Sequence, residues 1–217
     1  MKIALFGASG MVGLRIMAEA VQRGHDVTAI VRNPSALHTD LPRVTVMQGD
    51  ATDASRVAEL VRGHDVVIDA IAPPRGPQAR ADVLPHAVRG LMEGMKNAGV
   101  RRLLVVGGAG SLLVGDGVPL LSTPTYPEAY RAEAMGQRQA LDELQSRAAG
   151  AGIEWTYLSP AAELLPRERT GKYRVGGDEL MVDERGRSRI SAEDYAVAML
   201  DEVEKPQHTG KRFSVAY

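Results

Sequence analysis

Three glycines near the start of the chain, Gly7, Gly10 and Gly13, have the spacing of a turn that binds phosphate. They follow a short apolar run and open a segment whose apolar residues recur at helical spacing. Such a turn needs glycine where it is tight, where the backbone approaches a pyrophosphate, and where the helix packs on the strand. The N–H groups and the positive dipole end of the helix would then face the phosphates. The pattern predicts dinucleotide contacts, with a purely structural turn as the alternative, at Gly7, Ala8, Ser9, Gly10, Met11 and Val12.

The end of the next apolar run carries Arg32 and Asn33, and Arg32 lies 19 residues after Gly13. A site for NAD usually holds an acid there, which binds the ribose hydroxyls. A guanidinium instead suits a 2′-phosphate, which it can bind through two parallel hydrogen bonds, so the sequence favours NADP over NAD. The alternative is that Arg32 is a solvated loop residue.

Asp50 and Ala51 follow the third apolar run. At this position a carboxylate can accept a hydrogen bond from the adenine amino group while the next residue packs on the ring. We therefore count both residues as predicted cofactor contacts. The alternative is an ordinary turn or an acid that caps the helix beginning near Asp53.

Small, uncharged residues follow the fourth apolar run, from Ala70 to Pro74, and suit the side of a cofactor's inner ribose. The two prolines could equally be simple punctuation of the chain. A glycine-rich segment follows the fifth run, and open α/β sheets bind ligands beyond the carboxyl ends of their strands. We therefore expect both segments beside the cofactor. The predicted contacts are Ala70, Ile71, Ala72, Gly107 and Gly108.

Candidates for contact with a substrate come from the same region. Ser111 ends the glycine-rich segment and is a candidate hydrogen-bond donor, although such a serine often serves only the backbone. Tyr126 and Tyr130 are four residues apart and would share one face at the start of the next helix. We take Tyr130, with Ser111, as a candidate to orient a substrate. Routine packing of the two rings is the alternative.

The elements that must position these residues alternate along the chain. Continuous apolar strands separated by helices imply a parallel sheet covered on both faces, with right-handed crossovers. The fold class is therefore α/β, as a doubly wound parallel sheet of the Rossmann type. The expected strands cover residues 2–6, 27–31, 44–47, 66–69, 102–106 and 153–158, and the expected helices cover about 12–20, 54–61, 81–98 and 128–149.

The last part of the chain differs in character. Short strands are predicted over 173–175 and 179–182, and a last strand over 211–216. Ser191 and Asp194 form a capping box that opens a helix ending near residue 203. With no linker-like composition, we expect one domain over residues 1–217, in which about 160–217 form a small cap on the substrate side.

Composition excludes several classes of function. The 26 Lys and Arg nearly balance 27 Asp and Glu, which argues against a nucleic-acid partner. The chain has no cysteine, so disulfides, thiolate metal sites and cysteine nucleophiles are excluded. Its five histidines have no paired ligand spacing, so we expect no metal site. No apolar stretch approaches membrane-spanning length. We expect no membrane partner, a cytoplasmic location, and a monomer or homodimer.

Several motifs together resemble those of the atypical short-chain dehydrogenase/reductases, and within them the NmrA-like NAD(P)H-binding group. They are GASGMVG at 7–13, VRNP at 31–34, GD at 49–50, GGAGS at 107–111 and ISAEDYA at 190–196. The resemblance covers essentially the whole chain. It implies a Rossmann fold with NADP across the strand ends and hydride transfer to flavins, quinones or related conjugated acceptors. It also implies that Ser159, Pro160 and Ala161 line the nicotinamide.

One departure from the resemblance bears on the chemistry. Classical members pair a tyrosine with a lysine four residues later, which lowers the tyrosine pKa so that it can protonate a carbonyl oxygen. No tyrosine in this chain has a lysine at that spacing. This disfavours alcohol or ketone chemistry, whereas a conjugated acceptor can take its proton from solvent.

We therefore predict an NADPH-preferring reductase of a conjugated small molecule. One alternative is an NADP-binding protein that senses redox state without turnover, which the missing tyrosine–lysine pair favours. A nucleotide-sugar epimerase or dehydratase is less favoured, because about 60 C-terminal residues are few for its substrate domain.

Overall fold

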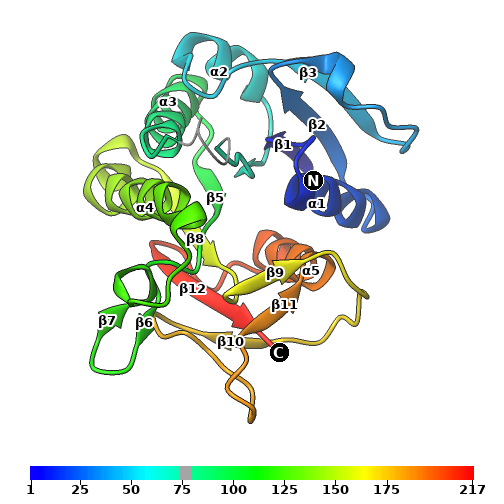
Figure 1. Ribbon diagram of the computed structural model, residues 1–217. Coiled ribbons are helices and arrows are strands. Elements are labelled where there is room, and N and C mark those ends of the chain that lie inside the picture. The colour runs from blue at the N-terminus through cyan, green and yellow to red at the C-terminus, as the bar shows by residue number, and fades with distance from the viewer. Residues whose placement is uncertain (74–79) are drawn as a thin grey trace.

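A mostly parallel sheet of eight strands forms the centre of this computed structural model, which describes residues 1–73 and 80–217 (Figure 1). The strands are β1 (Lys2–Phe6), β2 (Asp26–Val31), β3 (Val44–Gln48), β4 (Val66–Asp69), β5 (Arg102–Val106), β8 (Glu154–Ser159), β10 (Arg174–Gly176) and β12 (Lys211–Ala216). Their order across the sheet is β10-β12-β8-β5-β4-β1-β2-β3. Neighbours run parallel except β10 and β12, which are antiparallel. Pro74, at the end of the predicted Ala70–Pro74 segment, lies outside the described residues.

Helices cover both faces of the sheet, as Figure 1 shows. Successive side chains of a strand point to opposite faces, so Ile3 and Leu5 join one apolar core while Ala4 and Phe6 join the other. The first core includes residues of α1 (Met11–Gln22) and α5 (Ala192–Glu204), and the second includes residues of α2 (Ala54–Val61), α3 (Val83–Ala98) and α4 (Arg131–Ala151). The doubly wound architecture is confirmed. None of the helices in the described ranges combines the length and apolar character needed to cross a membrane.

Short elements connect the main ones. The 3₁₀ helices are η1 (Pro34–Ala36), η3 (Leu120–Ser122) and η4 (Glu128–Tyr130). Two small sheets accompany them: antiparallel β6 (Leu113–Val114) with β7 (Val118–Pro119), and parallel β9 (Glu163–Leu165) with β11 (Arg189–Ser191). Tyr130 therefore ends a 3₁₀ turn, and the helix predicted from residue 128 begins as an α-helix only at Arg131.

The strand order reverses direction at β1, which pairs with β2 on one side and β4 on the other. Ligands of doubly wound sheets bind in the crevice beyond the carboxyl ends of the strands at such a switch point. The glycine turn follows β1 directly, so the predicted phosphate-binding turn lies at the switch point of the sheet.

Residues 160–217, predicted to form a small cap, also supply strands of the main sheet. They supply β10, β12 and α5, while β9 follows the carboxyl end of β8 and pairs with β11. Ser191 Oγ accepts a hydrogen bond from the Asp194 N–H at 2.9 Å, which confirms the predicted N-terminal cap of α5. The strand predicted over 179–182 is wrong. The chain there makes only an isolated bridge between Glu179 and Leu113, because β10 pairs with β12 instead of folding back on this segment.

A buried carboxyl group lies at the switch point. Asp69 ends β4, is 2% exposed, and accepts a hydrogen bond from the Ile71 N–H at 3.0 Å. Burial raises the pKa of Asp69 to about 7 because the charged form is disfavoured away from water, and the Ile71 N–H opposes this only in part. The Asp69 carboxyl group is therefore protonated in acid and becomes charged near neutral pH, which lowers the free energy of unfolding.

The substitution Gly13→Ala should destabilise the protein. A Cβ at Gly13 would lie 2.2 Å from the Gly7 carbonyl oxygen, a backbone atom that cannot move without disturbing the turn. We expect a loss of roughly 1–3 kcal/mol in the free energy of unfolding, measured by urea denaturation. Gly150→Ala, in α4 with no atom within 4 Å of the new Cβ, is the matched control and should be neutral or stabilising by up to about 1 kcal/mol. Equal stability of the two variants would contradict the close contact.

Asp69→Asn should change the pH dependence of stability. Because the folded pKa lies above the unfolded one, the native state binds the extra proton, and stability falls as pH rises from about 4 to about 7. A pKa raised from 3.8 to about 7 corresponds to about 4 kcal/mol. Asparagine keeps an acceptor for the Ile71 N–H and does not titrate. Between about pH 5 and about pH 8 the fall in unfolding free energy should be smaller by about 3 kcal/mol in the variant than in the wild type, because about two pH units of this titration lie in that range. The same fall in both proteins would show that Asp69 does not titrate there.

Candidate functional site

The glycine turn after β1 joins a helix whose first turn has no side-chain cap. Gly7 has a φ of 75°, and the Gly10 N–H donates to its carbonyl oxygen at 3.0 Å. Gly10 is the N-cap of α1 and makes no side-chain capping bond. The N–H groups at this end of the helix can therefore bind an anion. The structure brings to this end all the predicted turn contacts, namely Gly7, Ala8, Ser9, Gly10, Met11 and Val12.

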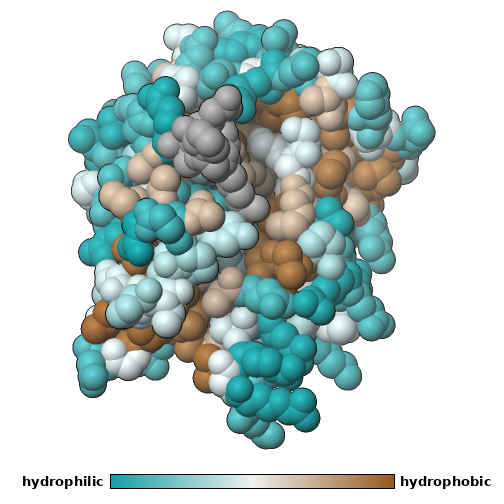
Figure 2. Space-filling model, viewed as in Figure 1, coloured by the Kyte–Doolittle hydropathy of each residue, from teal (hydrophilic) through white to brown (hydrophobic). Residues whose placement is uncertain are grey.

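The turn contacts the end of β4. A Cβ at Gly7 would lie 2.4 Å from the Ala70 carbonyl oxygen, which shows how closely the two segments approach. Ala70 is buried, Ile71 is half-buried, and Ala72 is exposed. The predicted inner-ribose segment therefore does lie beside the predicted phosphate turn. In Figure 2 this face is hollowed near its middle, and brown and pale surfaces border the hollow.

An open hollow of about 500 Å³ lies beyond β2 and β3. Arg32 and Asp50, the predicted contacts for the adenosine end of a dinucleotide, both line it. Arg56 also lines it. This residue was not predicted as a contact, because nothing in the local sequence pattern links α2 to the end of β3. The remaining lining residues are Gln48 and Gly49.

The charged groups of this hollow interact. Asp50 Oδ1 accepts hydrogen bonds from the N–H and the hydroxyl of Thr52, at 2.9 and 2.8 Å. The Thr52 backbone bond is the largest cause that lowers the pKa of Asp50, and the positive charge of Arg32 also lowers it. Asp50 is therefore an ionised acceptor at neutral pH. Asn33 Oδ1 accepts from the N–H and the hydroxyl of Ser35, at 3.2 and 2.8 Å, so this oxygen caps η1. Ala51 is 3% exposed and packs in the core.

The end of β5 is held by a buried tyrosine. Tyr157, in β8, donates to Gln137 Oε1 at 2.8 Å, and its hydroxyl accepts from the Gly108 N–H at 3.2 Å. A Cβ at Gly107 would lie 2.2 Å from the Tyr157 ring. Burial raises the pKa of Tyr157 well above its ordinary value. Tyr157 and Gln137 therefore position the predicted nicotinamide segment. The only signal for this role in the sequence is the place of Tyr157 in an apolar strand, because the hydroxyl of a buried tyrosine needs a hydrogen-bond partner.

Ser111 is bound by a residue from the last strand. Arg212 donates to the Ser111 hydroxyl at 2.9 Å and to its carbonyl oxygen at 3.2 Å, while Asp178 accepts from Arg212 Nε at 2.7 Å. The Ser111 oxygen thus accepts one bond and keeps its own proton to donate. Neither Arg212 nor Asp178 was predicted, because 101 residues separate Arg212 from Ser111.

The two candidate tyrosines lie in different environments. Tyr126 is half-buried, and its hydroxyl would be 3.4 Å from a Cβ placed at Gly110. Tyr130 is 46% exposed, so the predicted shared face does not bury both rings. At the end of β8, Pro160 and Ala161 are buried, and the buried Ser159 hydroxyl has no partner among the described residues. Within the described ranges, no group of three or more acidic or histidine side chains is arranged to hold a metal ion.

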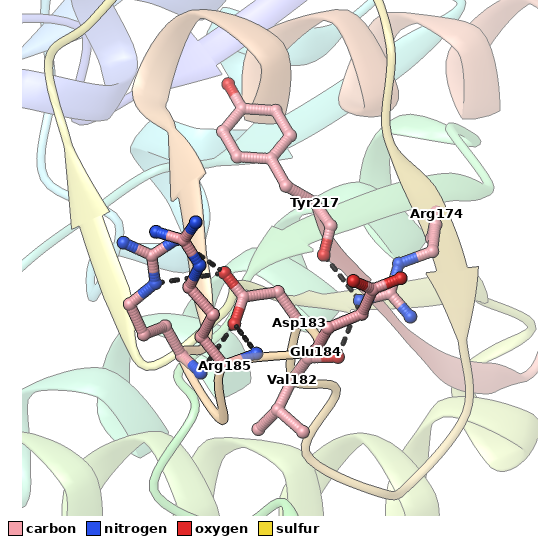
Figure 3. A pocket seen from close by; sticks show the side chains of 7 residues that line it. Arg174, Val182, Asp183, Glu184, Arg185 and Tyr217 are labelled. Atoms are coloured by element: carbon pink, nitrogen blue, oxygen red, sulfur yellow. Dashed lines mark hydrogen bonds and ion pairs between the residues drawn. The ribbon is translucent and has the colours of Figure 1, made fainter.

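A second hollow, of about 440 Å³, includes Tyr217, the residue that follows β12, in its lining (Figure 3). Its charged groups hold the turn at 183–187. Asp183 pairs with Arg187 at 2.9 Å and accepts from the N–H groups of Arg185 and Arg187, and these bonds lower the pKa of Asp183 to about 2. Arg174 donates to the carbonyl oxygens of Val182 and Tyr217. The structure of the turn itself accounts for these contacts, so we assign the hollow no ligand.

Comparisons with known proteins agree on the fold and differ on activity. A crystal structure from Burkholderia pseudomallei, named a "putative exported protein", is 43% identical, with each chain fully covered and a TM-score of 0.88. A "putative epimerase" from Bacteroides thetaiotaomicron is 38% identical over 100% of this chain and 96% of its own, with a TM-score of 0.89. A "putative NADH-flavin reductase" from Streptococcus pneumoniae is 33% identical over 100% and 99%, with a TM-score of 0.83.

The sequence also matches the model of a protein family. The family is described as NAD(P)H-binding, and the match covers residues 7–206. The match begins at the first glycine of the turn and includes the strand ends that line the site. The chain therefore belongs to the NAD(P)H-binding family.

Proposed function

We propose that this protein is an NADPH-dependent oxidoreductase that passes hydride to a planar, conjugated acceptor such as a flavin or a quinone. One observation carries the proposal: the open end of α1 and the hollow with Arg32 and Asp50 lie along the same edge of the sheet, at and beside its switch point. The name of the Streptococcus pneumoniae protein supports the acceptor class.

The chain's own groups would bind the cofactor along this edge. The N–H groups that begin α1 suit the pyrophosphate, and Gly7 lets it approach the backbone. Arg32 suits the 2′-phosphate, and the ionised Asp50 can accept from the adenine amino group. The ends of β4 and β5 would flank the inner ribose and nicotinamide.

NADPH would supply a hydride, which carries two electrons, and the acceptor would take one further proton from solvent while NADP⁺ forms. The contribution of the protein is positioning. Tyr157 holds Gly108 in place, and Ser111 keeps a proton that it can donate in a hydrogen bond to the acceptor. Tyr130 remains a second candidate to orient the acceptor.

We also propose that the protein is located in the cytoplasm. The name of the similar Burkholderia pseudomallei protein, which calls that protein exported, argues against this location.

A second candidate is an NADP-binding redox sensor without turnover. The absence of a tyrosine–lysine pair favours it, because the chain then lacks the usual proton donor for a carbonyl substrate. The same absence argues against an epimerase, although one similar protein carries that name.

The cofactor proposal predicts the outcome of a calorimetric titration with NADPH and with NADH. We expect NADPH to bind more tightly, and Arg32→Ala to lower its affinity about tenfold towards that of NADH, because a charge-assisted bond to the 2′-phosphate is lost. The NADH affinity of the variant is the internal control and should not change. If neither cofactor binds the wild type, the glycine turn is structural only.

The reductase proposal predicts turnover. Purified protein should oxidise NADPH faster than the uncatalysed reaction when menadione or FMN is added, as followed by the loss of NADPH absorbance. Ser111→Ala should lower kcat/KM for the acceptor by about tenfold, because an orienting hydrogen bond is lost, and leave the Kd for NADPH unchanged. Tight NADPH binding with no turnover on any flavin or quinone would contradict this proposal and favour the sensor.

A further inference from the structure

The hollow beyond β2 and β3 contains a cation that no motif indicated. Its lining residues include Arg32 and a second arginine, Arg56, which lies in the first turn of α2. We propose that Arg56 binds the 2′-phosphate of the cofactor together with Arg32, so that two arginines from separate segments set the preference for NADP over NAD. The inference rests on the proposed function only in taking the adenosine end of the dinucleotide as the ligand.

The charge of the hollow requires a second cation. Asp50 lines it with a carboxylate whose pKa is lowered, first by the Thr52 backbone bond and also by the charge of Arg32. The charges of Arg32 and Asp50 therefore offset each other. A 2′-phosphate carries a charge of roughly −1.5 to −2 near neutral pH, and a neutral lining would not favour it over a hydroxyl group. Arg56 adds a second positive charge to the lining residues, and Glu59, the carboxylate with which it pairs, is not one of them.

The guanidinium of Arg56 is already oriented. Its Nε and Nη2 donate to the Gln48 carbonyl oxygen at 3.3 and 3.1 Å, and Nη1 pairs with Glu59 at 2.7 Å. Its backbone N–H donates to Asp53, the N-cap of α2, at 3.0 Å. These bonds fix the side chain at the carboxyl end of β3, so less conformational entropy would be lost on binding.

Arg56 also keeps donors for a ligand. A guanidinium has five N–H groups, and the bonds to Gln48 and Glu59 use three of them. The side chain is 38% exposed and faces the hollow. One N–H group on Nη1 and one on Nη2 remain to donate to phosphate oxygens. The competing role is purely structural, with Arg56 only joining α2 to β3.

Titration calorimetry with NADP⁺ and NAD⁺ separates these roles, because the two ligands differ only in the 2′-phosphate. Arg56→Gln should weaken NADP⁺ binding by about tenfold and leave NAD⁺ binding within about twofold. Arg56→Lys keeps the charge but not the planar fork, and should lose about threefold. The ratio between wild type and Arg56→Gln should shrink as salt is raised, because the lost attraction is screened.

Arg62→Gln is the matched control, since Arg62 is an exposed arginine at the other end of α2 and does not line the hollow. It should leave both affinities unchanged, which excludes an effect of net charge alone.

Equal loss of NADP⁺ and NAD⁺ affinity in Arg56→Gln would show a structural role and overturn the inference. Unchanged NADP⁺ affinity in Arg56→Gln would also overturn it. A loss in Arg32→Ala without one in Arg56→Gln would overturn only this inference. Failure of the wild type to bind either nucleotide would overturn the proposed cofactor as well.

Discussion

The tightest constraint on the site is the backbone contact that joins β1, α1 and β4. The Gly7 carbonyl oxygen lies where a side chain at Gly13 would have to be, and the Ala70 carbonyl oxygen lies where one at Gly7 would have to be. Glycine at both positions lets the helix start immediately beside the end of β4. The uncapped end of α1 therefore opens at the switch point of the sheet. The segments predicted to bind the pyrophosphate and the inner ribose are thus brought together by close packing beside the hydrogen bond from the Ala70 N–H to the Phe6 carbonyl oxygen, at 2.9 Å.

The loops farther along the same edge are held by polar side chains, of which Tyr157 is buried and Arg212 is partly buried. Tyr157 joins the Gly108 N–H to Gln137 of α4, and Arg212 joins Ser111 to Asp178. The buried Tyr157 hydroxyl has partners, so its burial does not leave it unsatisfied. Such bonds connect the substrate side of the site to β8, α4 and β12. They make the site largely formed before any ligand binds, which lowers the entropy lost on binding.

The sequence predicted the parts of the site that depend on neighbours in the chain. The glycine turn, the strand ends and the cap at Ser191 follow from local spacing, and the structure contains each of them. Arg56 and Arg212 were not predicted, because their roles depend on which strand end a distant helix or strand approaches. The strand predicted over 179–182 is absent for the same reason. The neighbouring strand β10 pairs with the distant strand β12, and residues 179–182 make only the isolated bridge from Glu179 to Leu113.

The source of the proton that the reduced acceptor must gain determines which class of acceptor we propose. A reductase of carbonyl compounds needs an acid beside the carbonyl oxygen, and Tyr157 cannot serve because its hydroxyl donates to Gln137 and burial raises its pKa. Tyr195 is likewise buried, and its hydroxyl donates to the Leu158 carbonyl oxygen at 2.6 Å. Ser111 can donate a hydrogen bond but is too weak an acid to give up its proton. A flavin or quinone spreads the incoming charge over its rings and can take its proton from water, which is the reason that we propose such an acceptor in preference to an isolated ketone.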